Sequence, residues 1–130
     1  MSTVINLSGV QFTNPTKLGL VEGEKVMVKH HKQYDDNELA LGVHNEGGGL
    51  VGWIPKTETC QKYYEKEIES GNESKAMMQK ERKAISSALR DALTVDLFRN
   101  HLAVEGTITR LQQDYQTGEV LSVSVAFDYM

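Results

Sequence analysis

The sequence predicts a mainly β protein of the α+β type, built as a small, partly open β-barrel with a helical insertion between two strand zones. Residues 1–56 and 103–130 contain short apolar or alternating runs that Gly-rich turns separate, which is typical of antiparallel hairpins. Residues 57–102 are rich in Glu, Lys, Ala, Met and Gln, which helices favour. The six or so short strands are too few for a two-sheet sandwich, so we expect one domain over residues 1–130.

The first strand zone, residues 1–56, predicts a series of short strands. The run TVINLSGVQF predicts a first strand that reaches Phe12, and KVMVKH predicts a second. Leu39, Leu41 and Val43 alternate with other residues, which predicts a strand that is half-buried. The segment NEGGG then supplies a hairpin turn and LVGWI a return strand, which Pro55 ends because proline donates no ladder hydrogen bond.

The middle zone predicts two helices. The first covers about residues 57–69 and ends near SGN, and Asn72 or Ser74 caps the second. The β-branched pair Thr94 and Val95 marks a break in the second helix. Apolar residues at helical spacing predict the buried face of this helix. They are Met77, Ile85, Ala88, Leu89 and Ala92, and Leu97, Phe98 and Leu102 continue the apolar surface.

The last zone, residues 103–130, predicts a C-terminal hairpin. VEGTITRL forms its first strand, QDYQTGE its turn and VLSVSVAFDY its return strand. Alternation in the return strand predicts one apolar face. That face consists of Leu121, Val123, Val125, Phe127 and Tyr129.

Composition and charge restrict the function classes. Cys60 is the only cysteine, so we expect no internal disulfide, no Cys-cluster zinc site and a reducing cytoplasm. We find neither a signal peptide nor an apolar run long enough to span a membrane. The net charge of −4 argues against a general nucleic-acid binder, but Lys25, Lys29 and Lys32 form a local basic patch.

Spacing argues against a metal site and against catalysis. His30 and His31 are adjacent, so on a strand they point to opposite faces and cannot hold one ion. Asp35 and Asp36 diverge for the same reason, unless a turn brings them together. No G-x-S-x-G elbow and no phosphate loop is present. We therefore predict no metal, no cofactor and no enzymatic activity, although a site assembled only in space stays open.

Lysines and aromatic residues together predict contact with single-stranded nucleic acid, because lysines meet phosphates and aromatic faces stack bases. Tyr34 follows Lys32 by two positions, Trp53 and Lys56 lie on the adjoining hairpin, and Phe12 lies on the first strand. The alternative interpretation is that Trp53 and Phe12 are core residues, as large aromatic residues often are.

Residues 21–56 resemble the core of a HIRAN domain, preceded by GVQF at residues 9–12. Residues 57–90 fall outside the resemblance as an insertion, and Gln11 and Thr13 stand where the family has a basic residue and a second aromatic. The other matching positions are Gly23, Glu24, Val26, Tyr34, Asp35, Asn37, Leu39, Val43, Gly48, Val51, Gly52, Ile54, Pro55 and Lys56.

The resemblance implies a small OB-like or SH3-like barrel that binds single-stranded DNA and captures its free 3′-hydroxyl end. It implies that Tyr34 stacks on the terminal base and that Asp35 accepts a hydrogen bond from the hydroxyl. Trp53 takes a position that is often His in the family. The full predicted nucleic-acid set is Phe12, Lys29, Lys32, Tyr34, Asp35, Asn37, Trp53 and Lys56, with the lysines as phosphate contacts.

Two functions follow from the sequence. The first is a non-catalytic module that binds single-stranded DNA near a 3′ end, in DNA repair, replication or phage–host DNA metabolism. The second is a protein-interaction module, a bacterial or phage accessory or inhibitor protein that uses the helical insertion as its interface. Exposed Met77, Met78 and Ile85 would form that interface with a protein partner or with a second copy of the chain.

Overall fold

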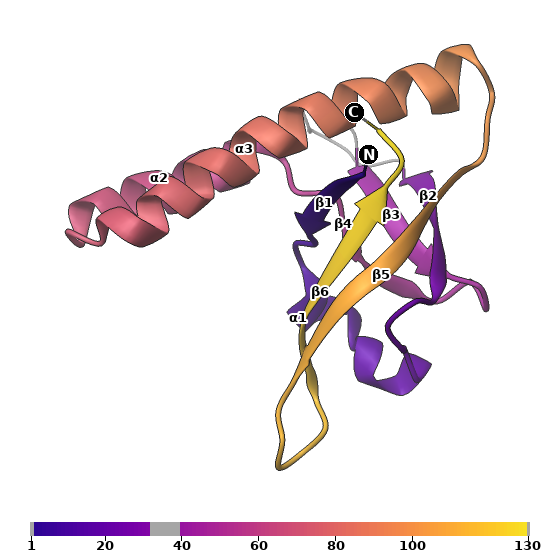
Figure 1. Ribbon diagram of the computed structural model, residues 1–130, viewed down its shortest axis with the longest axis horizontal. Helices are drawn as coiled ribbons and strands as arrows, with labels where there is room; N and C mark the ends of the chain where they lie inside the picture. The colour runs from indigo at the N-terminus through magenta and orange to yellow at the C-terminus, as the bar shows by residue number, and fades with distance from the viewer. Residues whose placement is uncertain (1, 32–39, 130) are drawn as a thin grey trace.

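The computed structural model describes residues 2–31 and 40–129, and six antiparallel strands in this part of the chain form one sheet (Figure 1). The order across the sheet is β1-β6-β5-β2-β3-β4. The strands are β1 Thr3–Asn6, β2 Lys25–His31, β3 Ala40–Asn45, β4 Leu50–Trp53, β5 Val104–Gln113 and β6 Val120–Phe127. The sheet is not closed, but an isolated bridge between Ser8 and Trp53 links the chain after β1 to β4.

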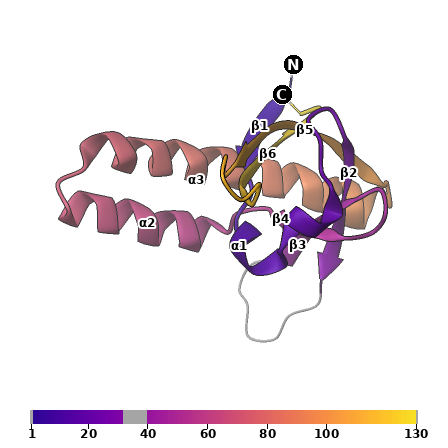
Figure 2. The same ribbon diagram turned by 90° about the horizontal axis from the view of Figure 1, so that it is seen from below.

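The helices form the second layer. They are α1 Val10–Thr13, the 3₁₀-helix η1 Pro15–Leu18, α2 Thr57–Glu69, α3 Glu73–Thr94 and the π-helix η2 Val95–Arg99. The C-terminal half of α3 crosses one end of the sheet, while its N-terminal half and α2 form a hairpin that projects from the sheet (Figures 1 and 2). None of the described helices has the length and apolar character that crossing a bilayer requires.

The predicted boundaries of the two long helices are confirmed. The first covers Thr57–Glu69, and Gly71, at φ 73°, turns the chain between the helices. The Asn72 side chain caps the second helix, because its oxygen accepts a hydrogen bond from the Lys75 N–H at 3.4 Å. This helix ends at Thr94, at the predicted β-branched break, and the wider π-helical turn follows.

The core lies between the sheet and the second half of α3. Its largest fully buried residues come mostly from the strands, and Leu89 and Leu93 of α3 complete it. Two buried polar side chains of α3 also reach the end of β4. The Ser86 hydroxyl donates to the Pro55 carbonyl, and the Arg90 guanidinium donates to the Ile54 carbonyl at 3.2 Å. These bonds satisfy carbonyl groups just past the strand's end, and they fix α3 against β4.

The predicted buried face of the second helix was mostly wrong. Met77, Ile85 and Ala88 are exposed, whereas Leu89 is buried as expected. The residues that are in fact buried on α3 are Ala76, Ser86, Leu89, Arg90 and Leu93. The physical reason is that α3 has two environments: its first half packs on α2, and its second half packs on the sheet.

Two strand predictions also need correction. The first strand ends at Asn6, because Gly9, at φ 69°, turns the chain into α1, so Phe12 lies on a helix and is 84% exposed. In the return strand Leu121 is 52% exposed although Val123 is buried. Gln112 pairs with Ser122 and Gln113 with Val120, so Leu121 is the extra residue of a β-bulge that reverses the alternation.

We expect Leu93→Ala to lower the free energy of unfolding by about 2–5 kcal/mol, because it opens a cavity beneath α3. Leu121→Ala is the matched control, and its loss should stay below about 1 kcal/mol because that side chain is already half in water. Urea unfolding of both variants measures the difference. Equal losses would contradict the burial of α3 against the sheet.

Candidate functional site

The outer face of β2, β3 and β4 carries a cluster of aromatic and basic side chains. We call it the Trp53 face, and it consists of Lys29, His31, His44 and Trp53. The half-buried strand predicted around residues 39–43 is in fact buried on both sides from Ala40 to His44. Its outer side is covered by this cluster. A Cβ on Gly42 would come within 2.7 Å of His31 Nε2, so the glycine gives the imidazole its space.

The two imidazoles of the Trp53 face share a hydrogen bond. His31 Nε2 lies 2.7 Å from His44 Nε2, and His44 Nδ1 lies 3.1 Å from the Gly48 carbonyl oxygen. Because a carbonyl can only accept, His44 Nδ1 carries the proton. With that proton on Nδ1, His44 Nε2 accepts the hydrogen bond that His31 Nε2 donates. The His31 ring also meets the Trp53 indole edge to face, with ring centroids 4.8 Å apart.

The pKa of the His31 imidazole is lowered from its ordinary value of 6.5, first by burial and then by the nearby charges of His44, His30 and Lys29. His31 is consequently neutral at neutral pH. Lys29 contributes a positive charge to this face, and that charge is one of the causes that lower the pKa of His31.

The adjacent histidines diverge, as their spacing predicts. His30 packs against Phe98 with ring centroids 5.1 Å apart, while His31 contacts His44 and Trp53. Within residues 2–31 and 40–129, no group of three or more His, Cys, Asp or Glu side chains converges as metal ligands would. Asp35 and Asp36 lie outside the described residues.

A pocket of about 220 Å³ opens beside Trp53 at the end of β4, and we call it the Trp53 pocket. It is lined by Ser8, Ala40, Leu41, Trp53, Ile54, Lys56 and Thr59. Ser8 exchanges two backbone hydrogen bonds of 2.9 Å with Trp53. A Cβ on Gly9 would lie 2.7 Å from Trp53 Cδ1, so the Gly9 backbone packs closely against the indole. The wall of the pocket is thus fixed by backbone contacts.

The structure brings together part of the predicted nucleic-acid set. Lys29 and Trp53 belong to the Trp53 face, and Lys56 lines the Trp53 pocket. Phe12 lies on α1, next to the glycine that supports Trp53. The predictions for Lys32, Tyr34, Asp35 and Asn37 lie outside the described residues, but Ala40, which follows them, lines the pocket.

Sequence reasoning missed Ser8, His31, His44 and Thr59 as residues of this region. One signal was available for the histidines. Gly42 interrupts an otherwise apolar strand, and an isolated glycine in a strand indicates that another group approaches closely. No comparable signal exists for Ser8 and Thr59, because a chain reversal and the first turn of α2 bring them together.

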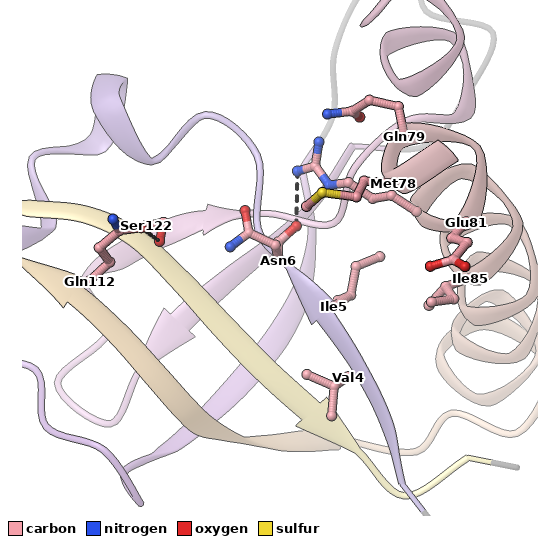
Figure 3. Close-up of a pocket in the computed structure, with 10 residues that line it drawn as sticks. Val4, Ile5, Asn6, Met78, Gln79, Glu81, Ile85, Gln112 and Ser122 are labelled. Carbon is pink, nitrogen blue, oxygen red and sulfur yellow. Dashed lines mark hydrogen bonds between the residues drawn. The ribbon is translucent and has the colours of Figure 1, made fainter. Parts of the chain in front are cut away.

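The predicted interface residues Met77, Met78 and Ile85 are exposed. Met78 and Ile85 of α3 face Val4 of β1 across a groove of about 460 Å³, which we call the Met78 groove (Figure 3). The dashed line at Asn6 in Figure 3 marks the 2.9 Å hydrogen bond that the Arg82 guanidinium donates to the Asn6 carbonyl. Met77 is not among the residues that line this groove.

The lowered pKa of His31 predicts a pH effect on stability. Below about pH 6.5 the unfolded chain binds a proton at this site more readily than the folded chain does, so stability falls as the pH falls. Urea unfolding at about pH 7.5 and about pH 5.5 measures this loss. In the His31→Gln variant the side chain can still donate a hydrogen bond to His44, but it does not titrate. We therefore expect this variant to lose less stability than the wild type between these two pH values. Equal losses in both proteins would contradict the prediction.

Comparison with known proteins leaves the family of this chain open. No family model, no curated protein and no solved structure matches it. The likeness to HIRAN domains therefore stays a prediction from the motifs in residues 9–56.

Proposed function

We propose that this protein binds single-stranded DNA near a free 3′-hydroxyl end, in the Trp53 pocket, and performs no chemistry on it. One observation carries the proposal: the pocket combines the Trp53 indole with Lys56 and with the hydroxyl groups of Ser8 and Thr59. An aromatic side chain on which a base stacks and a cation that meets phosphate are the groups with which proteins bind single strands.

The chemistry of the pocket suits a terminal nucleotide. The Trp53 indole offers a face or an edge for base contact, and base–aromatic contacts tolerate any sequence because every base has a π-face. Lys56 and Lys29 would neutralise phosphates, while the hydroxyls of Ser8 and Thr59 are candidate hydrogen-bond partners. Because acidic residues outnumber basic ones and the net charge is −4, we expect modest affinity and strong dependence on salt.

The resemblance to HIRAN domains supports the same site, because its hairpin motif includes Ile54, Pro55 and Lys56. Trp53 takes a position that is often His in the family. We further propose that the sheet is an open form of a small OB-like or SH3-like barrel, which the Ser8–Trp53 bridge supports.

The biological setting that we propose is DNA repair, replication or phage–host DNA metabolism in a cytoplasm, where the buried Cys60 thiol stays reduced.

The direct test is a fluorescence-anisotropy titration with labelled oligonucleotides that end in a 3′-hydroxyl, a 3′-phosphate or a duplex. We expect the hydroxyl-ended single strand to bind tightest, and we expect binding to weaken as salt rises. Equal affinity for the strands that end in a 3′-hydroxyl and in a 3′-phosphate would show that the protein does not recognise the hydroxyl end. No binding at tens of micromolar protein and low salt would overturn the proposal.

Variants test individual contacts in the same titration. Asp35→Ala should weaken the binding of the hydroxyl-ended oligonucleotide by about 1–3 kcal/mol, which is the cost of a lost charge-assisted hydrogen bond. Lys56→Ala should lower the slope of log K against log salt by about 0.7, the value for one phosphate contact on a single strand. Lys80→Ala is the matched control, because Lys80 is exposed on α3 and lines none of the described pockets near Trp53.

The Met78 groove favours a second candidate function, contact with another protein through the helical insertion. Val4, Met78 and Ile85 expose apolar surface around one groove, and β1 forms one edge of the sheet. Exposed apolar grooves beside an edge strand are typical of protein interfaces. A second copy of the chain is the simplest partner.

Light scattering after size-exclusion chromatography tests the second candidate. The second candidate is supported if the wild-type chain is a dimer and the Met78→Asp variant is a monomer. The variant would bury a carboxylate at the interface, which costs free energy. Met77→Asp is the matched control and should leave the mass unchanged, since Met77 lies outside the groove. A wild-type chain that stays monomeric at high concentration would exclude self-association through this surface.

A further inference from the structure

A second groove continues the Trp53 pocket toward the helical insertion. It measures about 430 Å³, and we call it the Tyr63 groove. Ser8 and Thr59 line both the pocket and this groove, so the two spaces are contiguous. Gly9 also lines the groove, and its backbone supports the Trp53 indole. A strand end in the Trp53 pocket therefore has the Tyr63 groove as its immediate neighbour.

Exposed aromatic rings from two different elements border this groove. Phe12 of α1 is 84% exposed, and Tyr63 of α2 is 44% exposed. Burying one large apolar side chain would stabilise the fold by about 1.5–3 kcal/mol, so two exposed rings beside one groove leave that much apolar surface available to a ligand. Two such rings beside one groove form a platform on which flat, unpaired bases can stack.

The residues that line the groove also carry a net positive charge. Arg82 supplies a cation, and none of the described residues that line the groove is acidic. The guanidinium donates from Nη2 to the Asn6 carbonyl at 2.9 Å, which fixes its position. Its buried Nε–H finds no acceptor in the part of the chain that the structure describes, and the same holds for the Gln79 Oε1 atom as an acceptor. Most buried polar atoms in folded proteins have a hydrogen-bond partner, so these two atoms set Arg82 and Gln79 apart.

We propose that the Tyr63 groove holds the nucleotides that precede the captured 3′ end, with bases on Tyr63 and Phe12 and a phosphate near Arg82. This inference rests on the proposed function, since it extends the same bound strand. It gives the helical insertion a role in DNA binding, because Tyr63 and Arg82 belong to α2 and α3. The insertion then forms one wall of a binding groove whose other wall comes from the chain after β1.

The neighbouring Met78 groove does not fit the same ligand. Arg82 lines both grooves, but the Met78 groove adds Glu81 and the apolar side chains of Met78 and Ile85. A carboxylate repels phosphate, and aliphatic side chains offer no flat face for stacking. The strand's path therefore runs along the Phe12 and Tyr63 side of Arg82.

Oligonucleotide length separates the groove from the pocket. We would compare a thymidine dinucleotide with an oligothymidylate of about eight nucleotides, both with a free 3′-hydroxyl, by isothermal titration calorimetry on the full chain. The longer strand should bind tighter. Tyr63→Ala should reduce the affinity for the longer strand by about 5- to 150-fold, the effect of losing one stacked base, and leave the dinucleotide unchanged.

Tyr115→Ala is the matched control, because Tyr115 is 92% exposed in the turn between β5 and β6 and lines none of these grooves. It should bind both strands as the wild type does. The inference is overturned, and the proposed function kept, if both strands bind equally well, or if Tyr63→Ala changes the two affinities by the same factor. If neither strand binds, the proposed function fails and the inference fails with it.

Discussion

The contact between α3 and the end of β4 is the constraint on which the rest of the structure depends. Leu89 and Leu93 bury apolar surface against the sheet, while Ser86 and Arg90 donate to the carbonyls of Pro55 and Ile54. Pro55 ends the ladder, so these carbonyls would otherwise be buried without partners, at about 1–3 kcal/mol each. One helix thus covers the core and completes the end of the strand. The chain continues from Pro55 directly into α2, whose first turn contributes Thr59 to the binding pocket that we propose.

Glycines determine the shape of the proposed binding surface. Gly42 leaves room for the His31 ring, and Gly9 lets the backbone approach the Trp53 indole closely, because a Cβ there would lie 2.7 Å from Cδ1. His31 in turn is held between Trp53 and His44. The indole is therefore fixed from two sides before any ligand arrives, and a preorganised aromatic wall costs little entropy on binding. The exposed rings of Phe12 and Tyr63 extend this surface along the groove beside it.

Local signals predicted most of the elements from the sequence. The glycine and asparagine at 71 and 72 marked the turn between the long helices, and Pro55 marked the end of β4. Side-chain environments were less predictable, since they depend on which elements meet. The buried face of α3 was mispredicted because half of that helix packs on another helix through Ala76 and half packs on the sheet. Leu121 was mispredicted because a β-bulge, invisible in the pattern, reverses the alternation. The pocket joins residues 8, 40, 53 and 59, which no spacing in the sequence connects.

The central claim is that a DNA end binds beside Trp53. Trp53 is the only tryptophan in the sequence, so its intrinsic fluorescence reports on this pocket alone. The most direct measurement is Trp53 emission during titration with an unlabelled, hydroxyl-ended single strand. We predict that the emission is quenched and saturates at the same concentration as binding measured independently, because a base contacts the indole. Binding that leaves the emission of Trp53 unchanged would contradict the claim and place the strand elsewhere on the protein.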